Sequence, residues 1–220
     1  MKPVTRSVSW QSWAAIAVIA AVLIAGAWAV FRWSALIHDR KSRPACGMHC
    51  GTERWAVKTL SDEGSTCIDF TPRETTVFWL VSQTVPERLP DQSRSGAIEC
   101  QVWKVTAKLV GFKAEDDGDF HIVLADLEHP ELNMIVEIPD SACDGACASA
   151  RELDIVRARE SFTKSFGEPV KKFQRVSQTV IVRVIGVGFF DFKHRQTGLA
   201  SNGIELHPLI GFEVNKGSQP

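Results

Sequence analysis

Two pairs of side chains with the same spacing can bind a metal ion or transfer protons. Asp119 and His121 are separated by a single residue, and so are Glu205 and His207. Alternate side chains of a β-strand point to the same face, so each pair would share one face of its strand. Carboxylates and imidazoles are ligands of zinc and similar ions, which activate bound water for hydrolysis. These four residues are therefore the candidate catalytic set of a metal-assisted hydrolase, of the phosphodiesterase or nuclease type.

The spacing of strands in a sheet limits this hypothesis. If the strands that carry His121 and His207 flank a third strand, their backbones are about 10 Å apart. A shared ion would then need a ligand from the strand between them, where Glu137 and Asn133 are polar residues that could serve. The simpler interpretation is that all these side chains are solvated on the outer face of a sheet. On that interpretation we expect no catalysis and no cofactor.

A second candidate site lies in residues 46–50, which read CGMHC. Cys46, Met48, His49 and Cys50 are soft ligands that together could hold Cu(I), and the two thiols could form a redox pair. The CxxC spacing of redox dithiols and the CxxCH motif of haem attachment are both absent here. We therefore prefer a structural role, either as a small local disulfide or with each cysteine bridged elsewhere.

The even number of cysteines bears on the compartment. The disulfide candidates are Cys46, Cys50, Cys67, Cys100, Cys143 and Cys147. Six cysteines downstream of a hydrophobic N-terminal segment are typical of an oxidising compartment. For the second CxxxC pair, Cys143 and Cys147, we expect a local disulfide that pins the entrance of a helix.

A segment long enough to cross a membrane precedes these residues. Residues 13–31 are 19 residues without a charge, and tryptophans flank both ends. As a helix this segment spans a hydrocarbon core of about 30 Å, and interfacial tryptophans favour anchoring. We expect an N-terminal tail over residues 1–12, an uncleaved transmembrane helix over 13–33 and a juxtamembrane linker over 34–51. The competing interpretation is a signal peptide, because alanines in the second half of the segment offer cleavage positions.

The orientation in the membrane rests on two opposing signals. Basic residues are more numerous after the hydrophobic segment than before it, which weakly favours a cytoplasmic C-terminal part, whereas the cysteines favour the other side. We give the cysteines more weight and expect a single-pass inner-membrane protein with a periplasmic domain. Beyond residue 43 the chain holds 19 basic and 25 acidic residues, a net charge of −6. This charge disfavours nucleic acid as a partner.

The hydrophobic periodicity predicts a mainly β domain over residues 97–214. Its five strands are expected near residues 103–112, 119–126, 132–139, 180–190 and 204–214. One helix is expected between strands 3 and 4, opening with the capping-box pair Ser149 and Glu152 and ending at Gly167. A slip of the apolar phase in the first strand predicts a bulge near Val110, and two glycines predict a bend in the fourth.

The flanking parts are predicted from shorter patterns. An accessory segment over residues 52–96 is expected to pack on the β domain, and residues 215–220 to form a disordered tail. Within the accessory segment, Trp55 and Val57 alternate with polar residues, which predicts a short strand. A brief helix should follow at residues 77–81, capped by one of the two threonines before it.

The order of three strands, one helix and two strands resembles the oligonucleotide/oligosaccharide-binding (OB) fold, a five-stranded Greek-key barrel. This resemblance implies that ligands lie across the outer face of strands 2 and 3, between the loops at residues 113–119 and 191–202. No aromatic side chain is expected on that outer face, which again disfavours nucleic acid. The candidate ligand-binding residues on this face and in the second loop are His121, Asn133, Glu137, Lys193, His194 and Arg195.

Several longer motifs point to a second resemblance. The stretches CGTERWAVKT, DGDFHIVLAD, MIVEIPDSAC, GFFDF and NGIELHP are similar to those of a group of uncharacterised bacterial exported proteins. That resemblance covers most of the chain after the membrane segment and implies no activity. We therefore expect a non-catalytic binding module, tethered to the membrane through residues 13–33, that presents its barrel to a saccharide, peptide or protein of the cell envelope.

Overall fold

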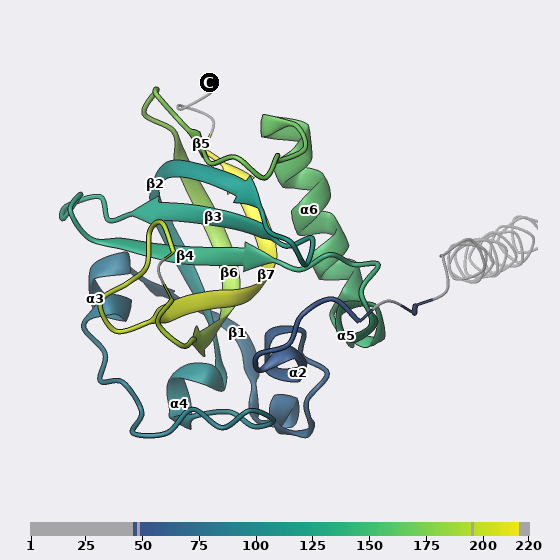
Figure 1. Ribbon diagram of the computed structural model, residues 1–220. Coiled ribbons are helices and arrows are strands. Elements are labelled where there is room, and N and C mark those ends of the chain that lie inside the picture. The colour runs from purple at the N-terminus through teal and green to yellow at the C-terminus, as the bar shows by residue number, and fades with distance from the viewer. Residues whose placement is uncertain (1–45, 48, 195, 216–220) are drawn as a thin grey trace, which may run out of the picture. The chain divides into compact units, whose positions relative to one another are not determined.

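The computed structural model describes residues 46–47, 49–194 and 196–215 (Figure 1). The predicted transmembrane helix over residues 13–33 lies outside the described residues, as do the N-terminal tail, most of the linker and nearly all of the C-terminal tail. Within the part that the structure describes, no helix combines the length and hydropathy needed to span a membrane.

The described residues form short helices, one longer helix and the strands of one sheet. The helices are α2 (Trp55–Lys58), the 3-10 helix η1 (Glu63–Cys67), α3 (Val77–Val81), α4 (Gly96–Glu99), α5 (Asp144–Ala148) and α6 (Glu152–Phe166). The strands are β1 (Asp69–Thr75), β2 (Gln101–Ala114), β3 (Phe120–Ala125), β4 (Asn133–Ile138), β5 (Gln174–Arg175), β6 (Ile181–Phe190) and β7 (Ile204–Val214).

Five of the strands close into a barrel. Their order is β2-β3-β4-β7-β6, and pairing between β6 and β2 completes the ring. All neighbours are antiparallel except β4 and β7, which are parallel. The helix α6 comes between the third and fourth barrel strands in the chain, β4 and β6. The predicted mainly β domain, with a closed five-stranded barrel and a helix among its strands, is confirmed.

The strand β2 bends so that it can serve two neighbours. Residues 102–108 pair with β6, and residues 108–114 pair with β3. The register with β3 shifts between Leu109 and Gly111, which is the predicted bulge. Register shifts also occur at Gly186 and Gly188 of β6, where the glycines predicted a bend. A Cβ on Gly188 would lie 2.3 Å from the carbonyl oxygen of Ile98, so this position requires glycine.

The barrel interior is filled with apolar side chains from all five strands. Members of this core include Val105, Ala107, Ile122, Leu124, Met134, Val136, Val182, Val184, Ile204 and Leu206. The helix α6 packs against the barrel through Ile155, Ala158 and Phe162 (Figure 1). The ring of Phe162 lies 5.0 Å from that of Phe112 and 5.1 Å from that of Phe212. Such aromatic contacts add to the free energy gained from burial.

Two local predictions were wrong. Residues 55–58 form a helical turn, not a strand, because Arg54 adopts a left-handed conformation with φ 51° and turns the chain there. The capping box at the start of α6 is also not formed. The hydroxyl of Ser149 accepts the N–H of Arg151, and the helix begins at Glu152 without a side-chain cap. The predicted end at Gly167, with φ 78°, is confirmed.

The N-terminus of α3 is fixed from two sides. Thr76 caps the helix by accepting the N–H of Trp79, as the sequence predicted. Asp126, which directly follows β3, accepts the N–H of Phe78 at 2.7 Å, and it also accepts N–H groups from Glu128 and His129. Burial alone would raise the pKa of Asp126, but these donors outweigh burial and lower it. Asp126 therefore ties the accessory segment to the barrel as a carboxylate.

Asp126→Asn should lower the free energy of unfolding at pH 7 by about 1 kcal/mol, because an amide is a weaker acceptor for these donors. A carboxylate with a lowered pKa in the folded state stabilises above its unfolded pKa, and this stabilisation is lost as pH falls through the folded value. The difference from wild type should thus shrink below about pH 4. Urea denaturation at pH 7 and pH 3 measures this difference in the free energy of unfolding, and the exposed Asp91→Asn is the control. A difference that stays constant with pH would contradict this role.

Candidate functional site

Five chemistry-bearing side chains meet on the outer face of β3, β4 and β7. We call Asp119, His121, Glu137, Glu205 and His207 the polar cluster. His121 and Glu137 are directly opposed in the β3–β4 ladder, and Glu205 is opposed to Ile135 of β4. Every member of the cluster is at most 5% exposed. The interpretation of these residues as solvated outer-face side chains is therefore wrong, because other parts of the chain cover them.

Glu137 links the two histidines. Its Oε1 lies 2.9 Å from Nδ1 of His121, and its Oε2 lies 3.3 Å from Nδ1 of His207. The other ring nitrogen of His121 lies 2.9 Å from the carbonyl oxygen of Thr197. Nε2 of His207 lies 3.3 Å from Oδ2 of Asp119. The strand between the histidines thus supplies the middle carboxylate, which is the arrangement that a shared site would need.

Two segments close over the polar cluster, and we call their described residues, 49–62, 191–194 and 196–203, the cover. In the second segment, Thr197 reaches His121, and the backbone at Gly198 lies so close to β3 that a Cβ there would be 2.5 Å from Val123. In the first segment, Lys58 donates to Asp191 at 2.9 Å and lies above the ring of Phe189. Both segments therefore contact the barrel beside the cluster.

Arg54 holds the first segment of the cover in place. Its guanidinium donates to both carboxylate oxygens of Glu99, at 2.7 and 2.9 Å, and to the carbonyl oxygens of Pro90, Ser93 and Phe190. These contacts use all five N–H donors of the side chain, although it is only 1% exposed. Glu99 in turn accepts N–H groups from Phe190 and Ser95. The pair joins the cover to α4 and to the end of β6.

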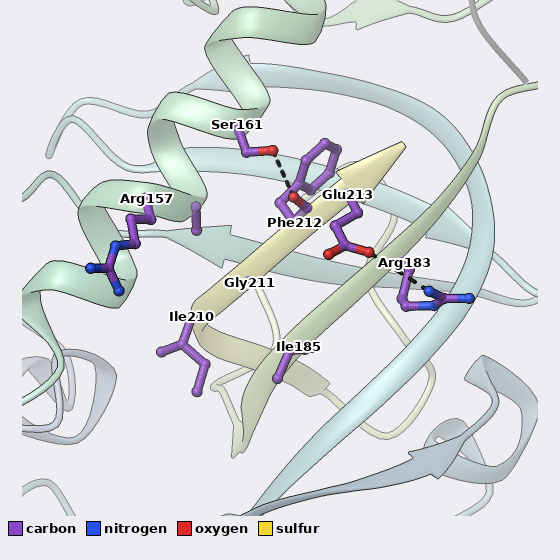
Figure 2. A pocket seen from close by; sticks show the side chains of 9 residues that line it. Arg157, Ser161, Arg183, Ile185, Ile210, Gly211, Phe212 and Glu213 are labelled. Carbon is purple, nitrogen blue, oxygen red and sulfur yellow. Dashed lines mark hydrogen bonds and ion pairs between the residues drawn. The ribbon is translucent and has the colours of Figure 1, made fainter. Parts of the chain in front are cut away.

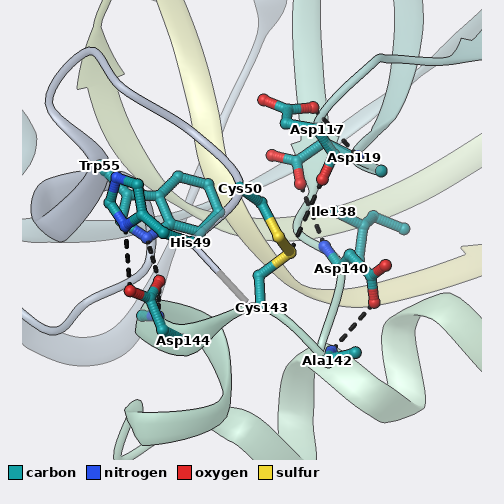
Figure 3. Close-up of a disulfide and its surroundings, with 12 residues drawn as sticks. His49, Cys50, Trp55, Asp117, Asp119, Ile138, Asp140, Ala142, Cys143 and Asp144 are labelled. Carbon is teal, nitrogen blue, oxygen red and sulfur yellow. Dashed lines mark hydrogen bonds and ion pairs between the residues drawn. A yellow bond between two sulfur atoms is a disulfide. The ribbon is translucent and has the colours of Figure 1, made fainter. Parts of the chain in front are cut away.

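Two disulfides attach the start of this segment and the residues before it to α5, and Figure 3 shows the one between Cys50 and Cys143. Cys46 is bonded to Cys147, and Cys50 to Cys143, while the third disulfide joins Cys67 to Cys100. The local Cys143–Cys147 disulfide that the sequence predicted is therefore wrong, and the alternative for Cys46 and Cys50, that each is bridged elsewhere, is correct. All six sulfurs are paired.

The disulfide pairing also affects the candidate copper or dithiol site. A sulfur in a disulfide has no thiolate to bind Cu(I) or to exchange, so Cys46 and Cys50 are structural in this state. His49 instead forms an ion pair with Asp144, whose other oxygen accepts the indole N–H of Trp55 at 2.7 Å (Figure 3). Asp144 thus reinforces the link that the two disulfides make.

The charges in the cluster are unevenly balanced. Burial, followed by the carboxylates of Glu137 and Asp191, raises the pKa of Glu205 well above its ordinary value. Burial also acts to raise the pKa of Glu137, but the hydrogen bond with His121 and the nearby cations outweigh it and lower the pKa. For Lys58, burial acts to lower the pKa, and the surrounding carboxylates raise it by more. The surroundings therefore favour the ionised form of Glu137, whereas they raise the pKa of Glu205.

Several buried polar atoms of the cluster lack a hydrogen-bond partner among the described residues. They are Oδ2 of Asp119, both carboxylate oxygens of Glu205 and both ring nitrogens of His207. Donor atoms of Asp119, Glu137 and His207 lie within 4.8 Å of one another, as do those of Glu115, His121 and Glu137. A buried group without a partner costs free energy, so this arrangement is suited to a ligand that supplies the missing contacts.

The predicted ligand-binding residues are not all brought together. His121 and Glu137 lie in the cluster, but Asn133 is at the opposite end of β4, where its amide donates to the carbonyl of Glu131. Lys193 is exposed, and His194 is paired with Glu53 of the cover at 2.8 Å. Arg195 lies outside the described residues.

The sequence reasoning missed three residues of the site. Arg54 and Lys58 belong to the accessory segment, in which a short strand was predicted, and Glu115 belongs to the loop at residues 113–119. The only available signal was their position inside the motifs CGTERWAVKT and KAEDDGD, and this position does not reveal burial. The ion pair between Lys58 and Asp191 joins segments 133 residues apart, so no local pattern predicts it.

A separate pocket of about 270 Å³ lies between α6 and the strands β6 and β7 (Figure 2). Its lining includes Arg157, Arg183, Ile185, Ile210 and Glu213, and the hydroxyl of Ser161 donates to the carbonyl of Phe212 beside it. Both arginines already have acidic partners, Arg157 in Asp154 and Arg183 in Glu213. The volume lies just below the usual range for small-molecule sites, and the charges are satisfied. The polar cluster is therefore the stronger candidate site.

Lys58→Met should lower the free energy of unfolding by about 3 kcal/mol, because it leaves the carboxylate of Asp191 buried without its cation. The side chain of Asp191 is 2% exposed, so water cannot replace the ammonium group. Lys171→Met breaks an exposed ion pair with Asp116 and is the matched control, with no measurable change expected. Chemical denaturation of both variants measures the contrast. Equal effects of the two substitutions would show that the cover pair is not buried in solution.

Comparison with known proteins gives no match to this chain, whether by family model, by curated protein or by solved structure. The interpretation of the site therefore rests on its geometry and its chemistry.

Proposed function

We propose that the chain is a membrane-anchored binding module that acts outside the cytoplasm and takes a small ligand at the polar cluster. Three disulfides are expected in an oxidising, extracytoplasmic compartment. The hydrophobic residues 13–33 supply the proposed membrane anchor, with the folded domain on the periplasmic side. The ligand comes from the cell envelope, and nucleic acid is disfavoured by the net charge.

The barrel is proposed to be of the OB type. The observed order of the five strands, the parallel pairing of β4 with β7 and the helix after the third strand all support this proposal. In OB barrels, ligands commonly occupy the outer face of the second and third strands. In this chain that face carries His121 and Glu137.

The closure of this face is the observation that carries the proposal of a small ligand. The cover lies where an oligosaccharide or an extended peptide would bind, and the carbonyl of Thr197 already contacts His121. The face beneath the cover retains buried polar atoms without partners, on Asp119, Glu205 and His207. A site that excludes polymers but offers free donors and acceptors fits an ion or a small polar molecule. Saccharide, peptide or protein partners would then contact the outside of the cover.

A native mass spectrum of the full-length protein, purified in detergent, should show a mass above that of the denatured chain. Glu137→Gln should abolish this excess, since Glu137 lies at the centre of the cluster. Glu131→Gln, in the exposed turn before β4, is the matched control and should retain it. Equal native and denatured masses for the wild type, together with binding of an oligosaccharide that Glu137→Gln abolishes, would refute the small-ligand site.

A metal-assisted hydrolase is the second candidate function, favoured by Asp117 at the rim of the cluster. Burial, followed by the carboxylates of Asp119 and Glu137, raises the pKa of Asp117 to about 6. A group with this pKa can accept or donate a proton near neutral pH. Asp117 is half-buried, so a substrate can reach it more readily than it can reach the cluster itself.

The hydrolase candidate predicts turnover of a phosphodiester such as bis-p-nitrophenyl phosphate by the full-length protein. Asp117→Asn should lower kcat by about a hundredfold, as expected for loss of a general acid or base. Asp91→Asn, in an exposed loop, should leave the rate unchanged. Absence of turnover by the metal-loaded wild type would leave the binding module as the function.

A further inference from the structure

We propose that Asp119, Glu137 and His207 bind a divalent cation of the first transition row, for which Zn²⁺ is the representative. Asp119 directly precedes β3, Glu137 lies on β4 and His207 lies on β7, so three adjacent strands each contribute one ligand. The proposal rests on the proposed function, since it names the small ligand of the polar cluster. A site with an imidazole nitrogen selects zinc and its neighbours over Mg²⁺ and Ca²⁺, which prefer oxygen ligands.

The distances between the donor atoms suit such an ion. Nε2 of His207 lies 3.3 Å from Oδ2 of Asp119, and Nδ1 of the same ring lies 3.3 Å from Oε2 of Glu137. Two ligands that each lie about 2.0–2.2 Å from a tetrahedral ion are separated by about 3.3–3.5 Å. The ion would use one ring nitrogen of His207. One ligand atom from each of the three residues can be chosen so that all lie within 4.8 Å of one another, and the side chains would move closer together around the ion.

The buried atoms without partners are a second, independent indication. Both ring nitrogens of His207 and Oδ2 of Asp119 have no hydrogen-bond partner among the described residues, although His207 is 0% and Asp119 1% exposed. Buried imidazoles and carboxylates in folded proteins are normally satisfied by hydrogen bonds, ion pairs or metals. A cation at this point would satisfy the nitrogen and the oxygen at the same time.

The charge distribution supports a cation at this position. The ammonium of Lys58 is paired with Asp191, and His121 with Glu137. Asp119 has no ion pair with a lysine or arginine among the residues that the structure describes, and its Oδ2 lies 3.3 Å from Nε2 of His207. Arg159 lies near Asp119 but donates to the carbonyl oxygens of Gly118 and Ile138. The carboxylate of Asp119 is therefore the group that an added cation would balance.

The neighbouring set of Glu115, His121 and Glu137 is less suited to an ion. Both nitrogens of His121 already have partners: Nδ1 lies 2.9 Å from Glu137, and Nε2 lies 2.9 Å from the carbonyl of Thr197. Metal binding would have to break one of these contacts. His121 is better placed to orient Glu137 toward an ion on its other side, as hydrogen-bonded neighbours of metal ligands do.

The other ligands are positioned in the same way. Oδ1 of Asp119 accepts the N–H of Asp140 at 3.0 Å, which leaves Oδ2 directed to the site (Figure 3). The ring of Phe189 packs edge-on against His207 at 5.6 Å. The Cys50–Cys143 disulfide lies beside the loop before Asp119, with Sγ of Cys143 3.6 Å from the carbonyl oxygen of Asp117. The ligands are therefore held by contacts from outside the site.

The test uses the full-length protein in detergent. After removal of bound metal with a chelator, isothermal titration with Zn²⁺ should show one equivalent bound. Asp119→Asn and His207→Gln should each weaken this binding at least tenfold, whereas His49→Ala, which alters an exposed histidine beside the disulfides, should not. Near-ultraviolet circular dichroism checks that each variant is folded. Binding that is unaffected by both ligand substitutions, or no binding by the wild type, overturns the proposal.

X-ray absorption at the zinc edge measures the ligands of the bound ion in the wild type, so this part of the test does not depend on the variants. The expected signature is a shell of nitrogen and oxygen ligands with a single imidazole, and sulfur or several imidazoles would overturn the assignment. The proposed function fails separately from this inference. An organic molecule as the mass excess in the native spectrum would retain the small-ligand module and refute the metal site.

Discussion

The bidentate ion pair between Arg54 and Glu99 is the interaction on which the candidate site depends. It is fully buried, and it places the first segment of the cover against the end of β6. Burying two charges is costly, and here the cost is offset because every guanidinium N–H and both carboxylate oxygens have partners. This pair fixes the chain directly before Trp55 and Lys58, whose own partners are Asp144 and Asp191. A complete hydrogen-bond network thus holds the short helical turn α2 in place.

A second buried pair strengthens the same attachment. Arg94 donates to Asp62 at 2.7 Å and to the carbonyl oxygens of Val57 and Glu99. Together with two disulfides, these contacts fix a segment that has little regular secondary structure. Cross-links between distant parts of a chain reduce the entropy of the unfolded state, so they stabilise such a segment when hydrogen-bond ladders cannot. The cover is therefore a structured part of the domain that continues its core.

The closed barrel and the cover together create the environment of the polar cluster. The barrel places acids and histidines on the outer face of β3, β4 and β7, and the cover removes that face from water. In this low-dielectric setting each charge needs a partner, which explains the lysine that reaches Asp191 and the raised pKa of Glu205. The atoms that remain without partners are those that the proposed cation would contact. Stability and the proposed binding are linked here, because burial of the cluster under the cover produces the ion pairs and also leaves polar atoms without partners.

The sequence by itself determined the strands and their faces. Period-2 alternation identified four barrel strands, and a run of β-branched and aromatic residues identified the strand at residues 180–190. The phase slip predicted the bulge near Val110, and the spacing of Asp119 with His121 and of Glu205 with His207 placed each pair on the outer face. These features are local, because each depends on the geometry of a single strand. The even set of cysteines likewise indicated an oxidising compartment.

Only the tertiary structure decided what covers that outer face. Alternation shows which side chains share a face, but it does not show whether water or another segment lies against them. Two of the contacts that hold the cover join residues roughly a hundred positions apart or more. They are the Cys46–Cys147 disulfide and the ion pair of Lys58 with Asp191. Such contacts depend on how the barrel closes and where the cover crosses it. For this reason a set of side chains predicted to be solvated is instead a buried cluster.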